Sequence, residues 1–348
     1  MNSIQNHIIN TRTTVKDVLK RLDVLASDAI LFLVDDEEKL IGSLTDGDIR
    51  RGLINDLDLE SNISDFVQGS PKYFRQNEFS LEEMKTWRDN FYRIIPVLDS
   101  GDRIIDIVNF RLQKSYLPID GVIMAGGKGS RLMPLTENLP KPLIKVGEKP
   151  IIEYNIDRLK SYGIKNQAIT INYLGDQIIE AFGDGSSKGI KLNYTKESLP
   201  MGTMGALTLV ENLTNDYILV MNSDLLTDID YEDFFQELIS KNGDLAVATT
   251  THEVQIPYGI IESEDDYITD IKEKPTYTYY SNAGIYLFKK ELISHIPPDQ
   301  YFDATSFINL LLEEKKKVIH YPILGYWLDI GKHQDLEKAQ RDVHHLKL

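Results

Sequence analysis

Residues 121–142 read GVIMAGGKGSRLMPLTENLPKP, and this stretch decides the fold of the chain. The apolar run from Gly121 to Ala125 has the length of a buried strand, and a glycine-rich turn follows it immediately. Glycines allow backbone N–H groups to approach an anion closely, because no Cβ atom intervenes. A strand that leads into such a turn is where α/β proteins hold phosphates. With Arg131 and Lys141 nearby, the stretch predicts a cradle for a polyphosphate.

Two well-known phosphate loops do not fit this stretch. The dinucleotide fingerprint needs glycine or alanine where Leu132 stands, and the P-loop needs Lys-Ser or Lys-Thr where Gly127 and Lys128 stand. The stretch does match the pattern G-x-G-[ST]-R-[LM]-x-P-L-T-x-x-x-P-K-P. This pattern resembles the sugar-1-phosphate nucleotidylyltransferases, also called NDP-sugar pyrophosphorylases. The alternative is a glycine-rich surface turn with an unrelated arginine and lysine.

The composition excludes several classes of protein and of site. A formal charge of −16, from 38 basic and 54 acidic residues, argues against a general nucleic-acid binder but not against a local nucleotide pocket. The absence of cysteine excludes disulfides, thiolate catalysis and cysteine-based zinc sites. The opening residues MNSIQNHIINTRTT lack the apolar core of a signal peptide, and no apolar run is long enough to span a bilayer. We therefore expect a cytoplasmic protein without a membrane partner.

Two domains are expected from the 348 residues and from a change of pattern near Pro118. Residues 1–117 contain a strand–turn–strand–helix unit twice, in copies of about 1–60 and 61–117 that should pack as one small α+β module. Residues 118–348 alternate apolar strands with helical stretches, which predicts a Rossmann-like, mostly parallel sheet covered by helices. The family resemblance implies the same α/β architecture, of the GT-A-like type, for this second domain.

The first copy of the repeated unit carries the segment GSLTDGD at 42–48. It resembles a CBS domain, and the two copies together resemble a CBS pair that binds adenine nucleotides or related ligands. In such domains the residues at the places of Thr45 and Asp48 contact ribose and phosphate, so the resemblance implies a ligand site there. Ordinary helix N-capping explains the same residues nearly as well. The second copy ends at Asn109-Phe110 without a Thr-x-x-Asp pair, so at most one site is expected.

Three further stretches are candidates for a nucleotide and metal site. Residues 197–206, ESLPMGTMGA, resemble the family's E-x-x-x-x-G-T-[AM]-G-A element, which lies against the base and ribose. A buried strand over 217–221 leads to Asp224, at the strand end where open α/β sheets bind ligands. Asp224 is therefore the first candidate ligand for Mg²⁺, which takes carboxylate and phosphate oxygens. Residues 327–331, WLDIG, resemble the family's W-x-D-[IT]-G, which implies that Asp329 shares the ion; a turn residue before Gly331 is the alternative.

Three weaker elements lie between these motifs, at 258–261 (YGII), 273–275 (EKP) and 282–286 (NAGIY). Each resembles a family element that lies along the sugar or its phosphate, although an exposed lysine beside a proline is usually only a surface residue. Together with the stronger motifs they follow the family's order across 121–331. The resemblance implies that the sugar phosphate is bound by Tyr258, Gly259, Glu273 and Asn282.

The reaction implied by the resemblance forms an NDP-sugar and pyrophosphate from an NTP and a sugar 1-phosphate. The attacking phosphate oxygen is already anionic, so catalysis depends on positioning and charge neutralisation rather than on a general base. The implied catalytic cations are Arg131 at the β/γ-phosphates, Lys141 at the α-phosphate and Lys274 at the sugar phosphate. The implied NTP-binding residues are Ala125, Gly126, Gly127, Gly129, Ser130, Glu197, Gly202, Thr203 and Gly205.

These motifs leave the base and the sugar open. A CBS pair in front of a short transferase resembles bacterial guanylyltransferases of surface-sugar and nonulosonate (legionaminic acid type) pathways. That architecture implies GTP with glucosamine 1-phosphate, or with mannose or heptose 1-phosphate. UTP, dTTP and CTP are alternatives, as is a non-catalytic nucleotide sensor. The CBS pair would bind a nucleotide effector that regulates the enzyme, and the face-to-face association of such pairs predicts a homo-oligomer.

Overall fold

The computed structural model describes residues 3–76, 78 and 80–346. It divides into two compact units, Met1–Pro118 and Ile119–Leu348, and the division falls at the proline where the sequence pattern changes. Each unit has a hydrophobic core of its own. Among the described residues, none of the helices combines the length and the apolar character that crossing a bilayer would need.

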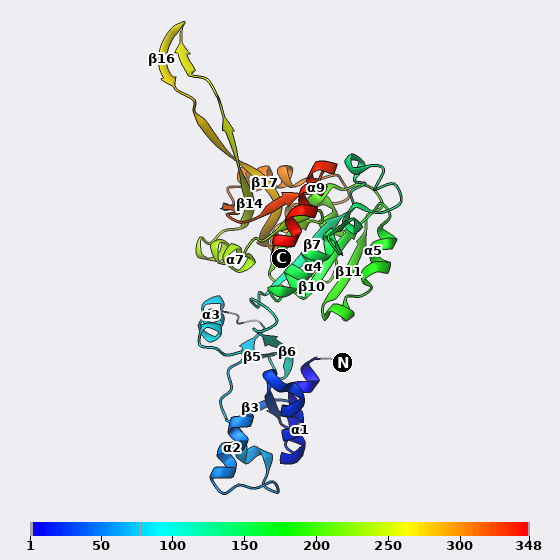
Figure 1. Ribbon diagram of the computed structural model, residues 1–348, viewed down its shortest axis with the longest axis vertical. Helices are drawn as coiled ribbons and strands as arrows, with labels where there is room; N and C mark the ends of the chain where they lie inside the picture. Colours follow the sequence, from blue (N-terminus) through cyan, green and yellow to red (C-terminus); the bar gives the residue numbers. More distant parts are fainter. Residues whose placement is uncertain (1–2, 77, 79, 347–348) are drawn as a thin grey trace. The chain divides into compact units, whose positions relative to one another are not determined.

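The N-terminal unit is built from two three-stranded sheets of the same design (Figure 1). In each sheet the first pair of strands is parallel and the second pair is antiparallel. The first half consists of β1 (Ile8–Asn10), α1 (Val15–Leu25), β2 (Ile30–Val34), β3 (Leu40–Thr45) and α2 (Asp46–Ile54). The second half consists of β4 (Phe74–Arg75), α3 (Leu81–Asp89), β5 (Ile94–Leu98) and β6 (Ile104–Asn109). Within the described residues, no helix corresponding to α2 follows β6.

Helical spacing of apolar residues explains how the first half packs. Val15, Val18 and Leu22 share one face of α1 and are buried against Leu31 and Leu33 of β2. The polar residues between them face solvent, so the helix covers one side of the sheet. A separate buried cluster joins the two halves of the unit through Phe32, Ile94 and Ile107.

The C-terminal unit is organised around a seven-stranded sheet of order β11-β10-β7-β12-β17-β14-β18 (Figure 1). Only β17 runs antiparallel to its neighbours, which confirms the predicted mostly parallel sheet. The strands are β7 (Ile119–Ala125), β10 (Asn166–Ile171), β11 (Lys191–Lys196), β12 (Tyr217–Asn222), β14 (Leu245–Gln255), β17 (Thr276–Lys289) and β18 (Val318–Pro322). The helices are α4 (Ile151–Ser161), α5 (Gly175–Phe182), α6 (Gly202–Gly205), α7 (Tyr231–Ser240), α8 (Ala304–Glu313) and α9 (His333–Asp342). Short paired strands complete the unit: β8 (Lys145–Val146) with β9 (Lys149–Pro150), and β13 (Leu225–Thr227) with β19 (Trp327–Asp329).

A buried carboxylate anchors the start of the central strand β7. Asp120 is completely buried and accepts hydrogen bonds from Asn166 Nδ2 (2.8 Å), the Thr214 N–H (2.5 Å) and Asn215 Nδ2 (2.7 Å). Burying an ionised group is costly unless donors satisfy its oxygens, and here several do. The carboxylate therefore ties β7 to β10 and to the loop that precedes β12.

The carboxyl ends of the three central strands meet at one edge of the sheet. The register pairs Ala125 of β7 with Ile171 of β10, and Met124 of β7 with Asn222 of β12. The glycine-rich loop after β7 therefore starts beside the segment that leads from β12 to Asp224. Loops that leave such strand ends commonly form ligand sites in open α/β sheets.

A long two-stranded ribbon leaves the other part of the sheet. β14 and β17 pair continuously from Thr249–Asn282 to Gln255–Thr276, and β15 (Ile260–Glu264) pairs with β16 (Tyr267–Lys272) beyond that point. Figure 1 shows this ribbon, in yellow tones, extending away from the sheet of its own unit. We call residues 251–281 the arm.

Candidate active site

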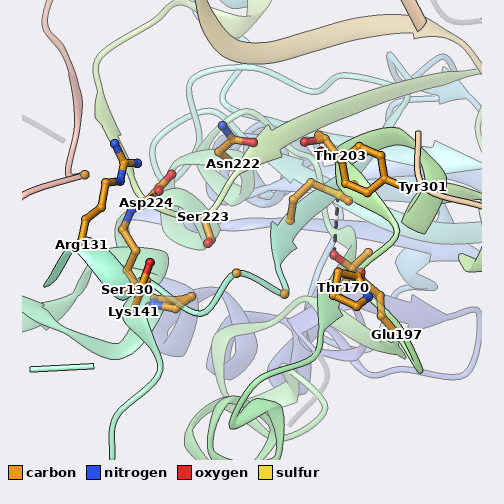
Figure 2. A pocket seen from close by; sticks show the side chains of 18 residues that line it. Ser130, Arg131, Lys141, Thr170, Glu197, Thr203, Asn222, Ser223, Asp224 and Tyr301 are labelled. Carbon is orange, nitrogen blue, oxygen red and sulfur yellow. Dashed lines mark hydrogen bonds and ion pairs between the residues drawn. The ribbon is translucent and has the colours of Figure 1, made fainter. Parts of the chain in front are cut away.

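A cavity of about 420 Å³ opens at the carboxyl ends of β7, β10 and β12 (Figure 2). Figure 2 shows charged groups and hydroxyls at one end, from Ser130, Arg131, Lys141, Ser223 and Asp224. The other end carries Thr170, Glu197, Thr203 and Tyr301. The remaining lining comes from Met124, Gly126, Gly127, Gly129, Pro142, Pro200, Gly202, Asn222 and Gly331. The cavity therefore has one end suited to phosphates and another suited to a nucleoside.

Two glycines of the glycine-rich loop lie close to other side chains. A Cβ atom on Gly126 would lie 2.5 Å from Glu197 Oε1, so the end of the Glu197 side chain would have to move. Gly129 has a φ of +63°, which favours glycine, and a Cβ there would lie 2.9 Å from Lys141 Cβ. The loop therefore passes close to Glu197 at the nucleoside end of the cavity and to Lys141 at the phosphate end.

Arg131 reaches the cavity from the 3₁₀ helix η4 (Ser130–Leu132). Its neighbour Leu132 is completely buried and holds this turn on the protein core. The guanidinium lies over Gly331, where an added Cβ would be 3.2 Å from Nη2 of Arg131. The last glycine of the WLDIG motif thus leaves space for the arginine of the first motif.

Lys141 forms an ion pair with Asp224 at the same end of the cavity. The lysine side chain is 10% exposed and the aspartate side chain 20% exposed, so solvent screens their attraction less than at an open surface. Both residues were predicted site residues, but the sequence contained no indication that they touch each other.

Asp224 and Asp329 bring two carboxyl groups together, although 105 positions separate them in the chain. Asp224 precedes β13 and Asp329 ends β19; these strands pair antiparallel, and the Ile330 N–H donates to the Asp224 carbonyl oxygen at 3.0 Å. Burial and the neighbouring Asp224 charge raise the pKa of Asp329 above its usual value.

Each of the two carboxylates has one buried oxygen, Oδ1, without a hydrogen-bond partner. Unpartnered buried carboxylate oxygens beside each other fit a divalent cation that retains water and phosphate oxygens as further ligands. The described residues contain no cluster of three or more His, Cys, Asp or Glu side chains suited to a metal. The pair therefore fits Mg²⁺ shared with a substrate rather than an ion fully enclosed by protein.

The nucleoside end is built from the ESLPMGTMGA segment and from a loop at 300–302. The Met204 and Gly205 N–H groups both donate to the Phe302 carbonyl oxygen, at 3.0 and 2.9 Å. A Cβ on Gly205 would lie 2.7 Å from the Gln300 carbonyl oxygen, so the two backbones can approach only because this residue is glycine. This contact brings Tyr301 into the lining of the cavity, where Figure 2 shows it near Thr203.

Glu197 lies directly after β11 with a side chain in the wall of the cavity. Glu197 is 9% exposed, and its Oε2 atom accepts a hydrogen bond of 3.2 Å from the Met201 N–H. Burial raises the pKa of this carboxyl group, while hydrogen bonds from Met201 and Thr170 oppose the shift. A buried acceptor at this end can recognise N–H groups of a base.

Most predicted site residues meet at this cavity. Its lining includes Gly126, Gly127, Gly129, Ser130, Arg131, Lys141, Glu197, Gly202, Thr203 and Asp224. Three others support it from nearby: Ala125 and Gly205 are buried behind the lining, and Asp329 stands next to Asp224. Asn282 lies at the root of the arm, where its Oδ1 accepts a 2.9 Å hydrogen bond from the Gly284 N–H.

None of the five residues predicted at the sugar or its phosphate lines the cavity, and Asn282 is the one of them at the root of the arm. Tyr258, Gly259, Glu273 and Lys274 are on the arm and exposed, and the Lys274 side chain is 64% exposed. Between Lys274 and Asn282 the chain is extended, which corresponds to about 25 Å along the ribbon. The structure therefore separates the predicted phosphate ligand Lys274 from Arg131 and Lys141.

Several residues that line the cavity were not predicted from the sequence. Asn222 and Ser223 immediately precede Asp224, so the strand-end argument that found Asp224 could have included them. Thr170 and Met124 lie near the ends of β10 and β7, and nothing in the sequence distinguishes them from other strand residues. Tyr301 carries no sequence signal, because only the contact between 300–302 and α6 brings it to the cavity.

In the N-terminal unit, Thr45 and Asp48 form a capping arrangement at the start of α2. Asp48 Oδ2 accepts hydrogen bonds from the Thr45 N–H (2.8 Å) and from the Thr45 hydroxyl (2.6 Å), and Oδ1 pairs with Arg51. Burial opposes ionisation of Asp48, but the Thr45 and Arg51 hydrogen bonds outweigh it and lower the pKa. The capping alternative thus describes the geometry of these residues in the structure.

Replacing Asp48 by alanine should lower the free energy of unfolding of the full chain by about 1 kcal/mol at pH 7. Because the folded-state pKa is depressed, this contribution is present above the ordinary aspartate pKa and is lost as the pH falls through the folded value. Urea unfolding of wild type and Asp48→Ala at pH 7 and at a pH well below the ordinary aspartate pKa of about 3.9 should give a smaller difference between the two proteins in acid. Asp46→Ala, an exposed carboxylate in the same helical turn, is the matched control. A constant difference at both pH values would contradict the charged cap.

Among known protein families, the one described as "Nucleotidyl transferase" matches residues 120–345 of this chain. A mannose-1-phosphate guanyltransferase of Pichia angusta is 31% identical over 226 residues, which cover 62% of this chain and 61% of that protein. A mannose-1-phosphate guanylyltransferase of Mycobacterium tuberculosis is 29% identical over 231 residues, covering 65% and 64% of the two chains. The chain thus spans less than two thirds of the length of these curated relatives.

Solved structures resemble the same part of the chain. HddC from Yersinia pseudotuberculosis, complexed with GMP-PN, matches with a TM-score of 0.50 and 25% identity, over 64% of this chain and 99% of that one. A Bacillus anthracis protein described as a glucose-1-phosphate thymidylyltransferase, in complex with a sucrose, matches with a TM-score of 0.54 and 26% identity, over 66% of this chain and 97% of that one.

Proposed function

The chain belongs to the nucleotidyl transferase family, and on this premise we propose that it transfers the GMP group of GTP to a sugar 1-phosphate and releases pyrophosphate. The observation that carries the proposal is the phosphate end of the cavity. There Arg131 and Lys141 stand beside the carboxylates of Asp224 and Asp329 at one edge of the sheet. Cations for a polyphosphate next to a pair of metal-type carboxylates suit the transfer of a nucleotidyl group.

In the proposed reaction, a phosphate oxygen of the sugar 1-phosphate attacks the α-phosphorus of GTP in line. The new P–O bond forms as the bond from the α-phosphorus to the bridging oxygen of pyrophosphate breaks. Arg131 holds the β/γ-phosphates, since its planar fork suits paired phosphate oxygens. Lys141 neutralises the charge that develops at the α-phosphate. The nucleophile is already anionic, so no residue needs to remove a proton.

The buried carboxylates of Asp224 and Asp329 would hold Mg²⁺ through the oxygens that lack partners. When bound, the ion would supply positive charge to the phosphate oxygens of both substrates. The ion pair between Lys141 and Asp224 keeps the lysine ammonium at this end of the cavity before substrate arrives.

Guanine is the base that the nucleoside end supports best. Glu197 offers a buried carboxylate, and a carboxylate only accepts hydrogen bonds. Guanine presents two adjacent N–H donors on its Watson–Crick edge, whereas uracil and thymine flank their single N–H with carbonyl oxygens that a carboxylate repels. The mannose-1-phosphate guanylyltransferase relatives and the HddC complex with GMP-PN support the same base.

Exchanging Glu197 for glutamine should reduce the preference for GTP over UTP by about 10- to 100-fold, the worth of a hydrogen bond to a charged group. The amide keeps the size of the side chain but replaces one acceptor by a donor that faces a guanine donor. Values of kcat/KM for GTP and UTP, measured by pyrophosphate release in both proteins, give the ratio. Glu180→Gln, on the exposed face of α5, is the control. An unchanged ratio would remove Glu197 from base recognition.

For the sugar, the fused architecture indicates glucosamine 1-phosphate, whereas the curated relatives act, by name, on mannose 1-phosphate. A panel of GTP, UTP, dTTP, CTP and ATP against glucosamine, mannose, glucose and heptose 1-phosphates tests the proposal directly. We expect the largest pyrophosphate release with GTP and one of the first two sugars. Release only with a pyrimidine nucleotide would overturn the base, and no release with any pair would favour the nucleotide sensor.

The N-terminal unit is proposed to be a CBS pair that binds a nucleotide and regulates the transferase. Its two sheets of equal design support the pairing, and the resemblance of segment 42–48 to a CBS domain supports one ligand position at Thr45 and Asp48. Binding of ATP or AMP to the full chain, measured by calorimetry, should weaken in Thr45→Ala. Kinetics that are unchanged by these nucleotides and by deletion of residues 1–117 would count against regulation.

A further inference from the structure

The arm exposes an apolar surface that nothing in the described chain covers. Ile261 and Ile271 face each other across β15 and β16, and the bulge after Glu262 brings Ile268, opposite Ser263, to their side of the ribbon. The three isoleucines are 58–60% exposed. Tyr258 and Tyr267 near the same end are 73% and 78% exposed. A two-stranded ribbon that extends beyond its sheet gains little stability by itself in water, and exposed apolar side chains grouped on one face mark an interaction surface.

The same arm carries the residues that the cavity lacks. If the proposed function is right, a second anionic substrate must bind beside GTP, and the cavity lining offers it no cation beyond Arg131 and Lys141. Lys274, with Glu273 beside it at 4.0 Å, stands exposed on the arm about 25 Å along the ribbon from Asn282. The site within one chain is therefore incomplete.

In this structure the paired ribbon holds Lys274 outside the cavity of its own chain. β14 and β17 are in continuous register from Thr249–Asn282 to Gln255–Thr276, and the Ile256 N–H donates to the Pro275 carbonyl oxygen (3.0 Å) beyond the last pair. Bending this segment back over its own sheet would break several of these backbone hydrogen bonds. A second chain can be reached with the ribbon intact.

We propose that the arm of one chain docks on a second copy of this protein and delivers Lys274 to that copy's cavity, where the lysine binds the phosphate of the sugar 1-phosphate. The inference rests on the proposed function for the identity of that substrate. The exchange is reciprocal: each copy provides its own arm and receives the arm of its partner, as two-fold symmetric dimers require.

The size of the arm suits a stable dimer. One face of a ribbon about 50 Å long and about 10 Å wide offers about 500 Å². Two arms and the two surfaces that they cover then bury about 2,000 Å², within the range of specific dimers. The exposed isoleucines are the apolar centre of each contact, and the acidic turn at 262–266 stays in solvent at its tip.

Complementation between two inactive full-length variants tests the exchange. Asp224→Asn removes a carboxylate of the cavity and leaves the arm intact, whereas Lys274→Ala removes the lysine of the arm and leaves the cavity intact. The two variants are coexpressed in equal amounts with different tags and purified together. This mixture should show about a quarter of the wild-type rate of pyrophosphate release. Half of the random dimers are mixed, and each mixed dimer has one of its two sites intact. Each variant alone should be nearly inactive.

The control pair is Asp224→Asn with Arg131→Ala, which damages the cavity in both chains and should regain nothing. Thermal melting must show that both variants are folded, and the two tags must show that mixed dimers are present. Under those conditions, no recovery of activity in the first pair would overturn the exchange, because a lysine that acts within its own chain cannot complement the other variant.

Ile271→Asp should lower the mass measured by sedimentation from that of a dimer to that of a monomer, and it should raise KM for the sugar phosphate. A wild-type protein that is monomeric while active would overturn the proposal, whereas an inactive wild-type protein that is dimeric through Ile271 would overturn only the proposed function.

Discussion

Replacing Asp224 by asparagine should lower kcat for pyrophosphate release by about 100- to 1,000-fold, the effect of removing one preorganised electrostatic group from a transition state. The carboxylate faces Asp329, keeps one buried oxygen without a partner and holds Lys141 in an ion pair. The amide keeps the shape of the side chain but removes the charge that a divalent cation and Lys141 both use. The concentration of Mg²⁺ needed for half-maximal rate should rise as well.

Stopped or continuous pyrophosphate assays over a range of Mg²⁺ concentrations measure both effects. Asp228→Asn is the matched control, because this exposed carboxylate follows the same short strand β13 but does not line the cavity. The melting temperature of Asp224→Asn should stay close to that of wild type, since the substitution also relieves repulsion of Asp329. A near-normal rate in a folded Asp224→Asn protein would remove the carboxylate pair from the metal site.

Removing the guanidinium of Arg131 should lower kcat/KM for GTP by about 100- to 1,000-fold. Arg131 lies over Gly331 at the phosphate end and carries a planar set of donors that suits two phosphate oxygens together. Arg131→Ala should show the full loss. Arg131→Lys should recover only part of it, because an ammonium retains the charge but not the paired geometry.

Lys128→Ala is the control for this prediction. Lys128 is a cation in the same glycine-rich loop, but it is exposed and does not line the cavity. If Lys128→Ala loses as much activity as Arg131→Ala, the loop acts through general positive charge and not through a directed guanidinium. If neither loses activity, the polyphosphate is not bound at this loop.

Much of the site could be predicted from the sequence because its parts are local. A buried strand, a glycine turn and two cations within 121–142 predict a phosphate loop, and the structure forms the strand as β7 and the turn as the cavity wall. The strand before Asp224 predicts a carboxylate at the sheet edge for the same reason. Tyr301 could not be predicted, since its position depends on backbone hydrogen bonds between α6 and Phe302. The capping of α2 by Asp48 was an open alternative, and only the hydrogen bonds of Thr45 distinguish it.

By itself the sequence determined the α/β class and the mostly parallel sheet, which follow from periodicity and turn chemistry over a few residues. Its resemblance to the motifs of a known family supplied the list of candidate residues for phosphate and metal. Only the tertiary structure decided which of these residues meet. The pairing of β13 with β19 joins Asp224 to Asp329, and the packing of two separate loops joins Lys141 to Asp224 and Arg131 to Gly331. It also decided that Lys274 stands on an extended ribbon outside the cavity, because the continuous register of β14 and β17 is a long-range property that no local motif encodes.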